Sequence, residues 1–299
     1  MKTIVCCPYC GRKAALKFPA KDLNRRISKE RFNYHRCSSC SLIFLCPIPR
    51  NLGDYYPATY YCLPSTLEEL AKGAEAERYK VDIIRRFVAR GRLLEIGPGT
   101  GGFAYLSKEA GFEVETIEMN RRCCLFIREV LRIPAIESDD TINALKQTAR
   151  FNVIALWHVI EHLPNPWATL DAIIEHLLPG GVLVLAAPNP GALQFRLLGR
   201  FWTHIDAPRH LQLIPTHVLT ESMHARRLKT LLTSTNDEGC RGWNHFGWTF
   251  SLANCSSSPF VKTQLGVFGG IVAKILEPLE CKNGLGSTYT LLFQKEGVS

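Results

Sequence analysis

The sequence predicts an α/β fold, in which helices cover both faces of a doubly wound, mostly parallel sheet behind a small N-terminal module. From about residue 91 onward, short apolar segments alternate with helical segments, which is typical of such a sheet. A glycine-dense turn directly follows the first of these strands, and two Cys-x-x-C pairs occupy the first 50 residues. With 299 residues, 46% of them hydrophobic, the chain has room for one large domain and one small one.

Residues 1–50 are predicted to be a zinc ribbon. About forty residues cannot build a self-sufficient core, so a metal would supply the missing stability. Two Cys-x-x-C knuckles are the expected ligand set of tetrahedral structural zinc. Free thiols or a ribbon that has lost its metal are the alternatives, and Cys6 and Cys46 are spare sulfurs that could substitute. The predicted ligands are Cys7, Cys10, Cys37 and Cys40.

The same 50 residues carry the whole formal net charge of +9, with eleven Lys and Arg against two acids. Such a basic surface can recruit an anionic partner, including nucleic acid, or it can simply be a solvated face.

Residues 51–90 are interpreted as a linker and a leading helix. Prolines and tyrosines alternate up to residue 66, and prolines forbid regular ladders there. The tyrosines either form a lid over a substrate or pack the ribbon onto the main domain. The apolar spacing then predicts a helix over 67–89.

The stretch from Arg92 to Phe103, RLLEIGPGTGGF, predicts a ligand site at the carboxyl end of the first parallel strand. A buried strand ends near Glu95, and Gly97, Gly99 and Gly101 then permit positive φ and a close approach of the ligand. The helix that follows directs unpaired N–H groups into the crevice.

The glycines alone do not identify the ligand, because Gly97, Gly99 and Gly102 also fit the dinucleotide fingerprint of a nicotinamide dehydrogenase. Glu95 favours a different ligand, since a carboxylate there would repel a pyrophosphate and attract an ammonium or a sulfonium. Glu118 ends the second strand, 21 residues after Gly97, where an acid can accept both hydroxyls of a ribose.

At these residues the chain resembles the class I S-adenosylmethionine-dependent methyltransferases. The closest likeness is to the branch that includes the ubiquinone-biosynthesis O-methyltransferases and relatives bearing an N-terminal zinc ribbon. The likeness covers roughly three quarters of the chain. It lies in LLEIGPGTG and in the stretches 151–166 (FNVIALWHVIEHLPNP), 177–190 (LLPGGVLVLAAPNP) and 206–219 (DAPRHLQLIPTHVL).

The resemblance implies a Rossmann-like sheet of seven strands within residues 91–299. Its sixth strand would be Leu228–Ser234, and its seventh, Tyr289–Gln294, would be inserted antiparallel. Between them, residues 236–286 form an insertion whose role is not readable, with one helical piece at Gly266–Leu279.

S-adenosylmethionine is the cofactor that the resemblance implies. Asp139 would contact the adenine amine, although acids at this position also cap helices, which Asp140 is well placed to do. The full set assigned to cofactor binding is Glu95, Gly97, Gly99, Gly101, Glu118, Asp139 and Trp157.

The loop after the fourth strand contains His158, Glu161 and His162 in the order H-x-x-E-H, which is also the inverted zinc-protease signature. That chemistry needs one continuous helix, and the prolines at 164 and 166 together with the preceding strand oppose it. In some relatives an E-x-x-E-H version of this loop holds Mg²⁺. His158 stands at its first position here, which leaves a divalent cation at the active site open.

A second polar cluster, which includes His204, Asp206, Arg209 and His210, follows the fifth strand, and both loops should open on one crevice. Histidine can remove a proton near neutral pH. We expect one of the four candidate catalytic histidines to be a general base, or several of them to bind a divalent metal. The alternative for each is a structural hydrogen bond. The candidates are His158, His162, His204 and His210.

Together these features predict methyl transfer to an oxygen, nitrogen or carbon atom of a small-molecule or lipid-linked acceptor. The alternative is an RNA-directed methyltransferase or a nucleic-acid-binding protein recruited through the basic ribbon. Trp157-His158 in place of an N/D-P-P-Y/F run argues modestly against N-methylation of bases. No apolar run approaches the ~18 residues of a membrane span, and the N-terminus lacks a signal-peptide core, so a cytoplasmic protein without a transmembrane segment is expected.

Overall fold

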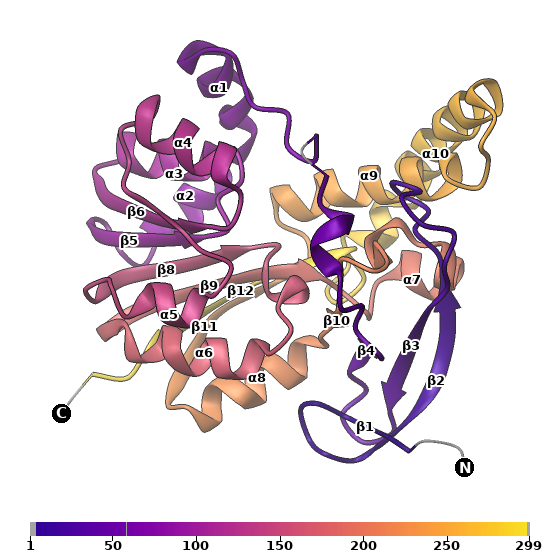
Figure 1. Ribbon diagram of the computed structural model, residues 1–299, viewed down its shortest axis with the longest axis horizontal. Coiled ribbons are helices and arrows are strands. Elements are labelled where there is room, and N and C mark those ends of the chain that lie inside the picture. The colour runs from indigo at the N-terminus through magenta and orange to yellow at the C-terminus, as the bar shows by residue number, and fades with distance from the viewer. Residues whose placement is uncertain (1–3, 58, 298–299) are drawn as a thin grey trace.

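The computed structural model describes residues 4–57 and 59–297 and contains the predicted sheet (Figure 1). Its seven strands lie in the order β11-β12-β9-β8-β5-β6-β7. β12 runs antiparallel to both of its neighbours and the remaining pairs are parallel, which confirms the expected doubly wound sheet with a reversed last strand. The strands are β5 (Gly91–Ile96), β6 (Phe112–Glu118), β7 (Ala135–Glu137), β8 (Phe151–Trp157), β9 (Leu177–Pro188), β11 (Leu228–Ser234) and β12 (Thr288–Lys295).

Helices cover both faces of this sheet because successive side chains of a strand point to opposite sides. In β8, Ile154 and Leu156 belong to one apolar core, while Val153 and Ala155 belong to the other. The first core is completed by α5 (Thr141–Leu145), α6 (Pro166–Glu175) and α8 (Thr216–Ala225), and the second by α1, α2, α3 (Gly102–Glu109) and α4 (Arg121–Glu129).

The leading helix predicted over 67–89 is broken into α1 (Leu67–Ala74), a 3-10 turn η2 (Glu75–Glu77) and α2 (Arg78–Arg85). The apolar periodicity continues through the break, so it could not reveal the tighter turn. The turn has a consequence for the site, because it brings Glu77 and Lys80 to the crevice beyond β5.

The ribbon is joined to the main domain by a shared sheet. Its strands are β1 (Val5–Cys6), β2 (Lys13–Ala20), β3 (Phe32–Cys37) and β4 (Ile43–Leu45), and the sheet is completed by β10 (Gln212–Leu213), which lies about 170 residues further along the chain. The Tyr9 ring also packs against Trp167 of α6, with centroids 4.4 Å apart. Shorter elements are η1 (Leu52–Tyr55), η3 (Ile160–His162), α7 (Leu193–Leu198), η4 (Gly199–Phe201) and η5 (Thr203–Ile205).

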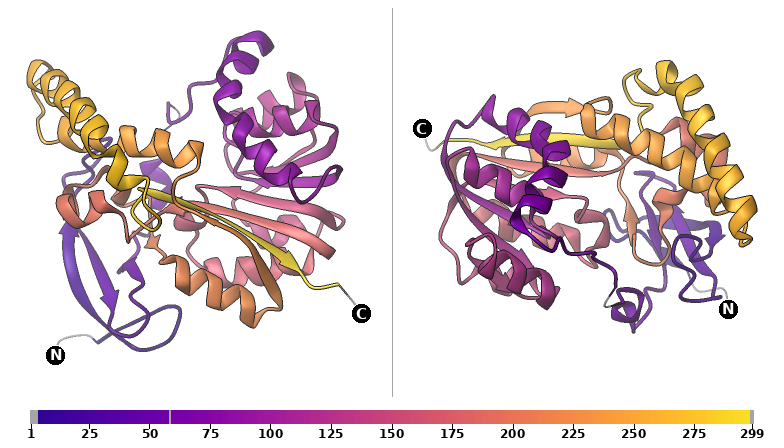
Figure 2. Two further views of the ribbon diagram at one scale, coloured as in Figure 1. Left: turned by 180° about the vertical axis from the view of Figure 1, so that it is seen from behind. Right: turned by 90° about the horizontal axis from the view of Figure 1, so that it is seen from above.

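The insertion contains far more helix than the sequence indicated. It folds into two long helices, α9 (Glu238–Ala253) and α10 (Pro259–Glu280), which pack as a hairpin that projects from the body of the molecule (Figures 1 and 2). α10 also corrects the expectation about apolar length. It has 22 residues, and over an 18-residue window its mean hydropathy is 1.2, so it is long and apolar enough to cross a membrane, although one such helix is no evidence that it does so.

A buried ion-pair network fastens the ribbon to the main domain. The Arg209 side chain is fully buried, and its Nη2 lies 2.7 Å from both Asp22 Oδ1 and Asp206 Oδ1. Asp22 belongs to the β2–β3 loop of the ribbon, whereas Arg209 and Asp206 belong to the segment before β10. Burial alone would raise the pKa of Asp206, but its hydrogen bonds from Arg209 lower that pKa to about 2.

We therefore expect Arg209→Met to destabilise the protein by about 3–5 kcal/mol, because two buried carboxylates lose their cation. Arg226→Met is the matched control, since it removes a half-exposed pair with Asp171 at 2.6 Å and should cost below about 1 kcal/mol. Urea unfolding measures both. Because the folded pKa of Asp206 is depressed, the contribution of the pair is present above about pH 4 and is lost as the pH falls towards 2. Equal losses of unfolding free energy in the two variants would contradict this role. So would a difference between wild type and Arg209→Met that stays the same as the pH falls.

Candidate functional site

The glycine turn after β5 forms one wall of a crevice of about 630 Å³. Gly97 and Gly99 have φ of 70° and 56°, in the left-handed region. A Cβ on Gly97 would lie 2.6 Å from Val159 Cγ2, so no other residue fits without movement of the loop after β8. Gly101, with φ of 84°, is the N-cap of α3. The turn therefore exposes its backbone at the carboxyl ends of β5 and β8, where doubly wound folds bind their ligands.

Glu95 points into this crevice from the end of β5, as the sequence predicted. It is 3% exposed, and its Oε2 has no hydrogen-bond partner among the described residues. Burial raises the pKa of Glu95 to about 8, Lys80 opposes the shift, and Glu77 and Glu118 add to it. A buried carboxyl with a free oxygen is suited to a ligand that brings its own positive charge.

Glu118 holds the glycine turn in place from the end of β6. Its Oε2 accepts a hydrogen bond from Gly99 N at 3.0 Å, and its Oε1 accepts one from Asn120 N at 2.7 Å. Each oxygen keeps a second lone pair, so a diol can still be bound. The Tyr61 ring lies against the same turn, within 3.0 Å of where a Cβ of Gly99 would be. The ribose contact of Glu118 stays a prediction.

Of the remaining residues assigned to the cofactor, Trp157 lines the crevice at the end of β8 and packs against Phe103, with centroids 5.6 Å apart. Asp139 is exposed and lies outside the residues that line the crevice. Its neighbour Asp140 caps α5 through a 3.0 Å bond from Asn143 N. The adenine contact of Asp139 also stays a prediction.

The H-x-x-E-H loop does not form the helix of a zinc protease. β8 runs into His158, which has φ of 57°, and only the 3-10 turn η3 follows. The loop instead brings its side chains to the cluster after β9, and the His162 and His210 rings lie 4.6 Å apart. All four histidines named from the sequence line the crevice: His158, His162, His204 and His210.

Backbone carbonyls fix the tautomers of two of these histidines. His210 Nδ1 lies 2.8 Å from His204 O, so this nitrogen donates and Nε2 is left as an acceptor. His162 Nδ1 lies 2.9 Å from the Tyr56 hydroxyl and 3.0 Å from Arg209 O, so its role depends on the tautomer. His204 donates from Nε2 to Trp243 O at 3.3 Å. Burial lowers the pKa of His162 to about 4 and that of His204 to about 3, so both rings are neutral at pH 7.

Glu161 is the functional candidate that sequence reasoning left out of its catalytic set. It is 1% exposed, and among the described residues neither carboxylate oxygen has a hydrogen-bond partner. His158 Nδ1 lies 3.6 Å from Glu161 Oε1, which is too long for a hydrogen bond. Burial pushes the pKa of Glu161 up, but the surrounding histidines outweigh it and the pKa is lowered. Ligand atoms of Glu161, His162 and His210 lie within 4.8 Å of one another, which suits one metal ion.

Residues of the linker and of the insertion complete the walls. Tyr60 and Tyr61 line the crevice, which gives the linker tyrosines a place at the site rather than a packing role alone. The Arg25 guanidinium lies 4.1 Å from the centre of the Tyr60 ring. From α9, the Trp243 ring packs against His158 with the centroids 4.8 Å apart and the planes tilted by 58°, a contact that no local pattern in the sequence could indicate.

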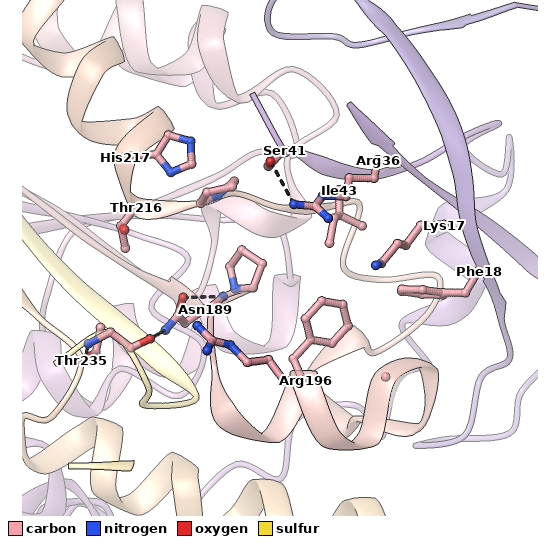
Figure 3. Close-up of a pocket in the computed structure, with 16 residues that line it drawn as sticks. Lys17, Phe18, Arg36, Ser41, Ile43, Asn189, Arg196, Thr216, His217 and Thr235 are labelled. Atoms are coloured by element: carbon pink, nitrogen blue, oxygen red, sulfur yellow. Dashed lines mark hydrogen bonds between the residues drawn. The ribbon is translucent and has the colours of Figure 1, made fainter. Parts of the chain in front are cut away.

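A second cavity of about 600 Å³ lies between the ribbon and the main domain (Figure 3). Lys17 and Arg36 from the ribbon and Arg196 from α7 reach its rim, and its lining includes no carboxylate. It shares no lining residue with the crevice and contains neither the glycine turn nor the histidines. The chemistry suggested by the sequence therefore belongs to the crevice.

Fold and site together define the class. A seven-stranded sheet with a reversed last strand, whose first strand leads into a glycine turn beside a buried acid, is the architecture expected of class I methyltransferases. A family model described as a methyltransferase domain matches residues 72–233, more than half of the chain, and the chain belongs to this family. Family membership implies an enzyme that uses S-adenosylmethionine.

Named relatives agree with this at low identity. The ubiquinone biosynthesis O-methyltransferase of Xanthomonas oryzae pv. oryzae is 27% identical over 123 residues, which cover 38% of this chain and 50% of that protein. The enzyme of the same name from Cereibacter sphaeroides is 27% identical over 173 residues, 54% of this chain and 68% of that protein. A SAM-dependent methyltransferase of Archaeoglobus fulgidus has a similar fold, with a TM-score of 0.51, 18% identity and coverage of 76% and 97%.

The chain thus spans about half the length of the first curated relatives it matches. Neither the family nor these relatives support the RNA-directed alternative.

Proposed function

We propose that this protein transfers a methyl group from S-adenosylmethionine to a nucleophile, preferably a hydroxyl, of a small-molecule or lipid-linked acceptor. The observation that carries the proposal is Glu95, a buried carboxyl with an unpartnered oxygen beside the glycine turn. A methyl donor that bears an ammonium and a sulfonium would supply the positively charged partner that this carboxyl lacks. The names of the relatives favour an O-methyltransferase.

The residues present fit such a donor. Glu95 would bind its cationic end, the backbone of Gly97 and Gly99 would accept close contact, and Glu118 would bind the ribose. S-adenosylmethionine supplies an activated methyl group on a good leaving group, so the protein mainly has to orient the acceptor and exclude water. Tyr60, Tyr61 and Trp243 are placed to do this.

Two roles are possible for His162 in this cluster, and its pKa favours one of them. A general base works best when its pKa lies near the working pH, whereas the pKa of His162 is lowered to about 4. A neutral imidazole can, by contrast, bind a metal ion through a ring nitrogen. We infer that Glu161, His162 and His210 hold a divalent cation, which would lower the pKa of an acceptor hydroxyl.

The four cysteines of the ribbon fit structural zinc. Sulfur-to-sulfur distances are 3.6 Å for Cys7–Cys40, 3.5 Å for Cys10–Cys37 and 3.7 Å for Cys10–Cys40. A tetrahedral ion with ligands at about 2.3 Å places sulfurs about 3.8 Å apart. We propose zinc at this cluster, where it would stabilise a sheet that the main domain shares through β10.

For the methyl donor, we expect wild-type protein to bind S-adenosylmethionine more tightly as the pH rises from 6 to 8, because Glu95 must lose its proton to face a cation. Glu95→Gln should weaken binding at pH 8 by about 10- to 100-fold and flatten the pH dependence. Glu109→Gln, an exposed position on α3, is the control. Calorimetric titration measures all three, and a wild type that binds NAD(P) but not S-adenosylmethionine would refute the proposal.

For the cation site, Mn²⁺ titration followed by electron paramagnetic resonance should detect one ion at the crevice. Glu161→Gln and His162→Gln should each weaken Mn²⁺ binding by about tenfold or more, as loss of a ligand does. His224→Gln, which removes an exposed histidine of α8, should leave it unchanged. Equal Mn²⁺ binding in all four proteins would remove the cation role.

For the ribbon, elemental analysis should find one zinc per chain, and Cys37→Ser should lose the metal and lower the midpoint of thermal unfolding. Cys255→Ser, at an exposed cysteine outside the ribbon, should keep both. If wild-type protein unfolds at the same temperature with and without zinc, the cluster is not a structural zinc site.

A further inference from the structure

α10 presents its larger apolar side chains to the outside and its small residues to the protein, unlike an ordinary surface helix. Its inner face, which packs on α9, is made of small residues such as Gly266, Gly269 and Ala273. A Cβ on Gly269 would lie 2.7 Å from both Thr249 Cα and Trp248 O, so the two backbones are in close contact. A helix that only covered the protein would turn its large apolar side chains towards that protein.

Seven large apolar side chains of α10 point outward instead, while Leu265, Val272 and Leu276 are half-buried beside the inner face. With about 100° of turn per residue the seven fall within an arc of about 120°, which includes the polar Gln264 but no charged residue. A largely apolar stripe of this kind marks an interaction surface. Its members and their exposed fractions are Phe260 (74%), Val261 (42%), Val267 (61%), Phe268 (55%), Ile271 (51%), Ile275 (68%) and Leu279 (41%).

A basic loop lies beside the same hairpin. The β2–β3 loop, residues 21–31, contacts the α9–α10 turn, where Arg26 Nη2 donates to Asn254 O at 3.2 Å and to Ser256 O at 2.5 Å. Asn254 Nδ2 also donates to Asn24 Oδ1 at 2.8 Å, and the views of Figures 1 and 2 agree that loop and hairpin are neighbours. The loop has two acids, of which Asp22 is neutralised by Arg209. Its bases are Lys21, Arg25, Arg26, Lys29 and Arg31.

We propose that the outer face of α10 and the basic loop dock this protein onto an anionic lipid surface. An apolar stripe beside a cluster of cations is complementary to acyl chains beneath anionic headgroups. A second copy of this chain is a poorer occupant, since each copy carries a formal net charge of +9 that this loop helps to supply.

The helix lies on the lipid surface and does not span it. Its inner face is covered by α9, and Glu280 near its end is buried, with Oε1 accepting a bond from Gln194 Nε2 at 2.8 Å. Lipid cannot surround a helix that is fixed in this way.

The hairpin also connects this surface with the crevice. Trp243, Phe246 and Phe250 form a row along α9, with ring centroids 5.3 Å and 4.2 Å apart. All three line the crevice; Trp243 contacts His158, and Phe250 is 43% exposed near the turn into α10. An acceptor with an apolar tail would lie along this row with its head at the histidines. This route rests on the proposed methyltransferase function, whereas the docking does not.

The test is flotation of the full-length protein with vesicles of phosphatidylcholine containing about one third phosphatidylglycerol, without S-adenosylmethionine. We expect the wild type to float with these vesicles and much less with pure phosphatidylcholine. Phe268→Ser/Ile275→Ser should lower the partition coefficient by about tenfold or more, since two large apolar contacts are lost without any change of charge. Leu16→Ser/Leu125→Ser, at exposed positions on β2 and α4, should leave it unchanged.

Lys29→Gln/Arg31→Gln should lower binding to the anionic vesicles and reduce its salt dependence. Circular dichroism and S-adenosylmethionine binding check that each variant is folded, so that a failure of docking is distinguished from a failure of the proposed function. Equal flotation of both apolar double variants would overturn the proposal. A second outcome would also overturn it: the wild type sediments as a dimer, Phe268→Ser/Ile275→Ser sediments as a monomer, and neither protein binds vesicles.

Discussion

The site depends on one buried cation. Arg209 is enclosed with Asp22 from the ribbon and Asp206 from the segment before β10, and neither carboxylate can be left alone in that environment without a large cost. The backbone around the pair then positions the imidazoles, because Arg209 O lies 3.0 Å from His162 Nδ1. On the ribbon side, the Tyr34 hydroxyl donates to His210 O at 2.7 Å. The ribbon is thus part of the scaffold of the crevice, and any loosening of its docking should reach the histidines.

Two buried carboxyl groups divide the crevice into regions with different electrostatics. The cation that most lowers the pKa of Glu95 is Lys80, which is already paired with Glu77, so burial prevails and the pKa rises to about 8. Glu161 faces three imidazoles instead, and its pKa falls. The first region therefore favours a ligand that carries its own positive charge, and the second favours a cation shared with the histidines. In the proposed function, the first region would hold the methyl donor and the second the acceptor.

The parts of this site that could be predicted from the sequence are those encoded locally. The turn of Gly97 and Gly99 follows a strand and precedes a helix, and that order is readable because each feature spans only a few residues. The break of the leading helix at Glu75–Glu77 was not readable, because the apolar periodicity of α1 continues into α2. The isolation of Glu161 and the contact of Trp243 with His158 depend on segments far apart in the chain, which no local pattern encodes.

The same reasoning explains why the sequence indicated only one helical piece, Gly266–Leu279, in the insertion. The glycines of α10 occupy the face where the backbone of α9 comes within van der Waals contact, and that packing is not encoded locally. This packing constrains the orientation of the helix. If α10 rotated so that Ile271 and Ile275 faced α9, their branched side chains would clash with the α9 backbone. That backbone lies so close that even a Cβ on Gly269 would not fit. The exposed stripe is therefore a consequence of how closely the hairpin is packed. Because α9 lines the crevice with its other side, whatever covers α10 lies one helix away from the histidines.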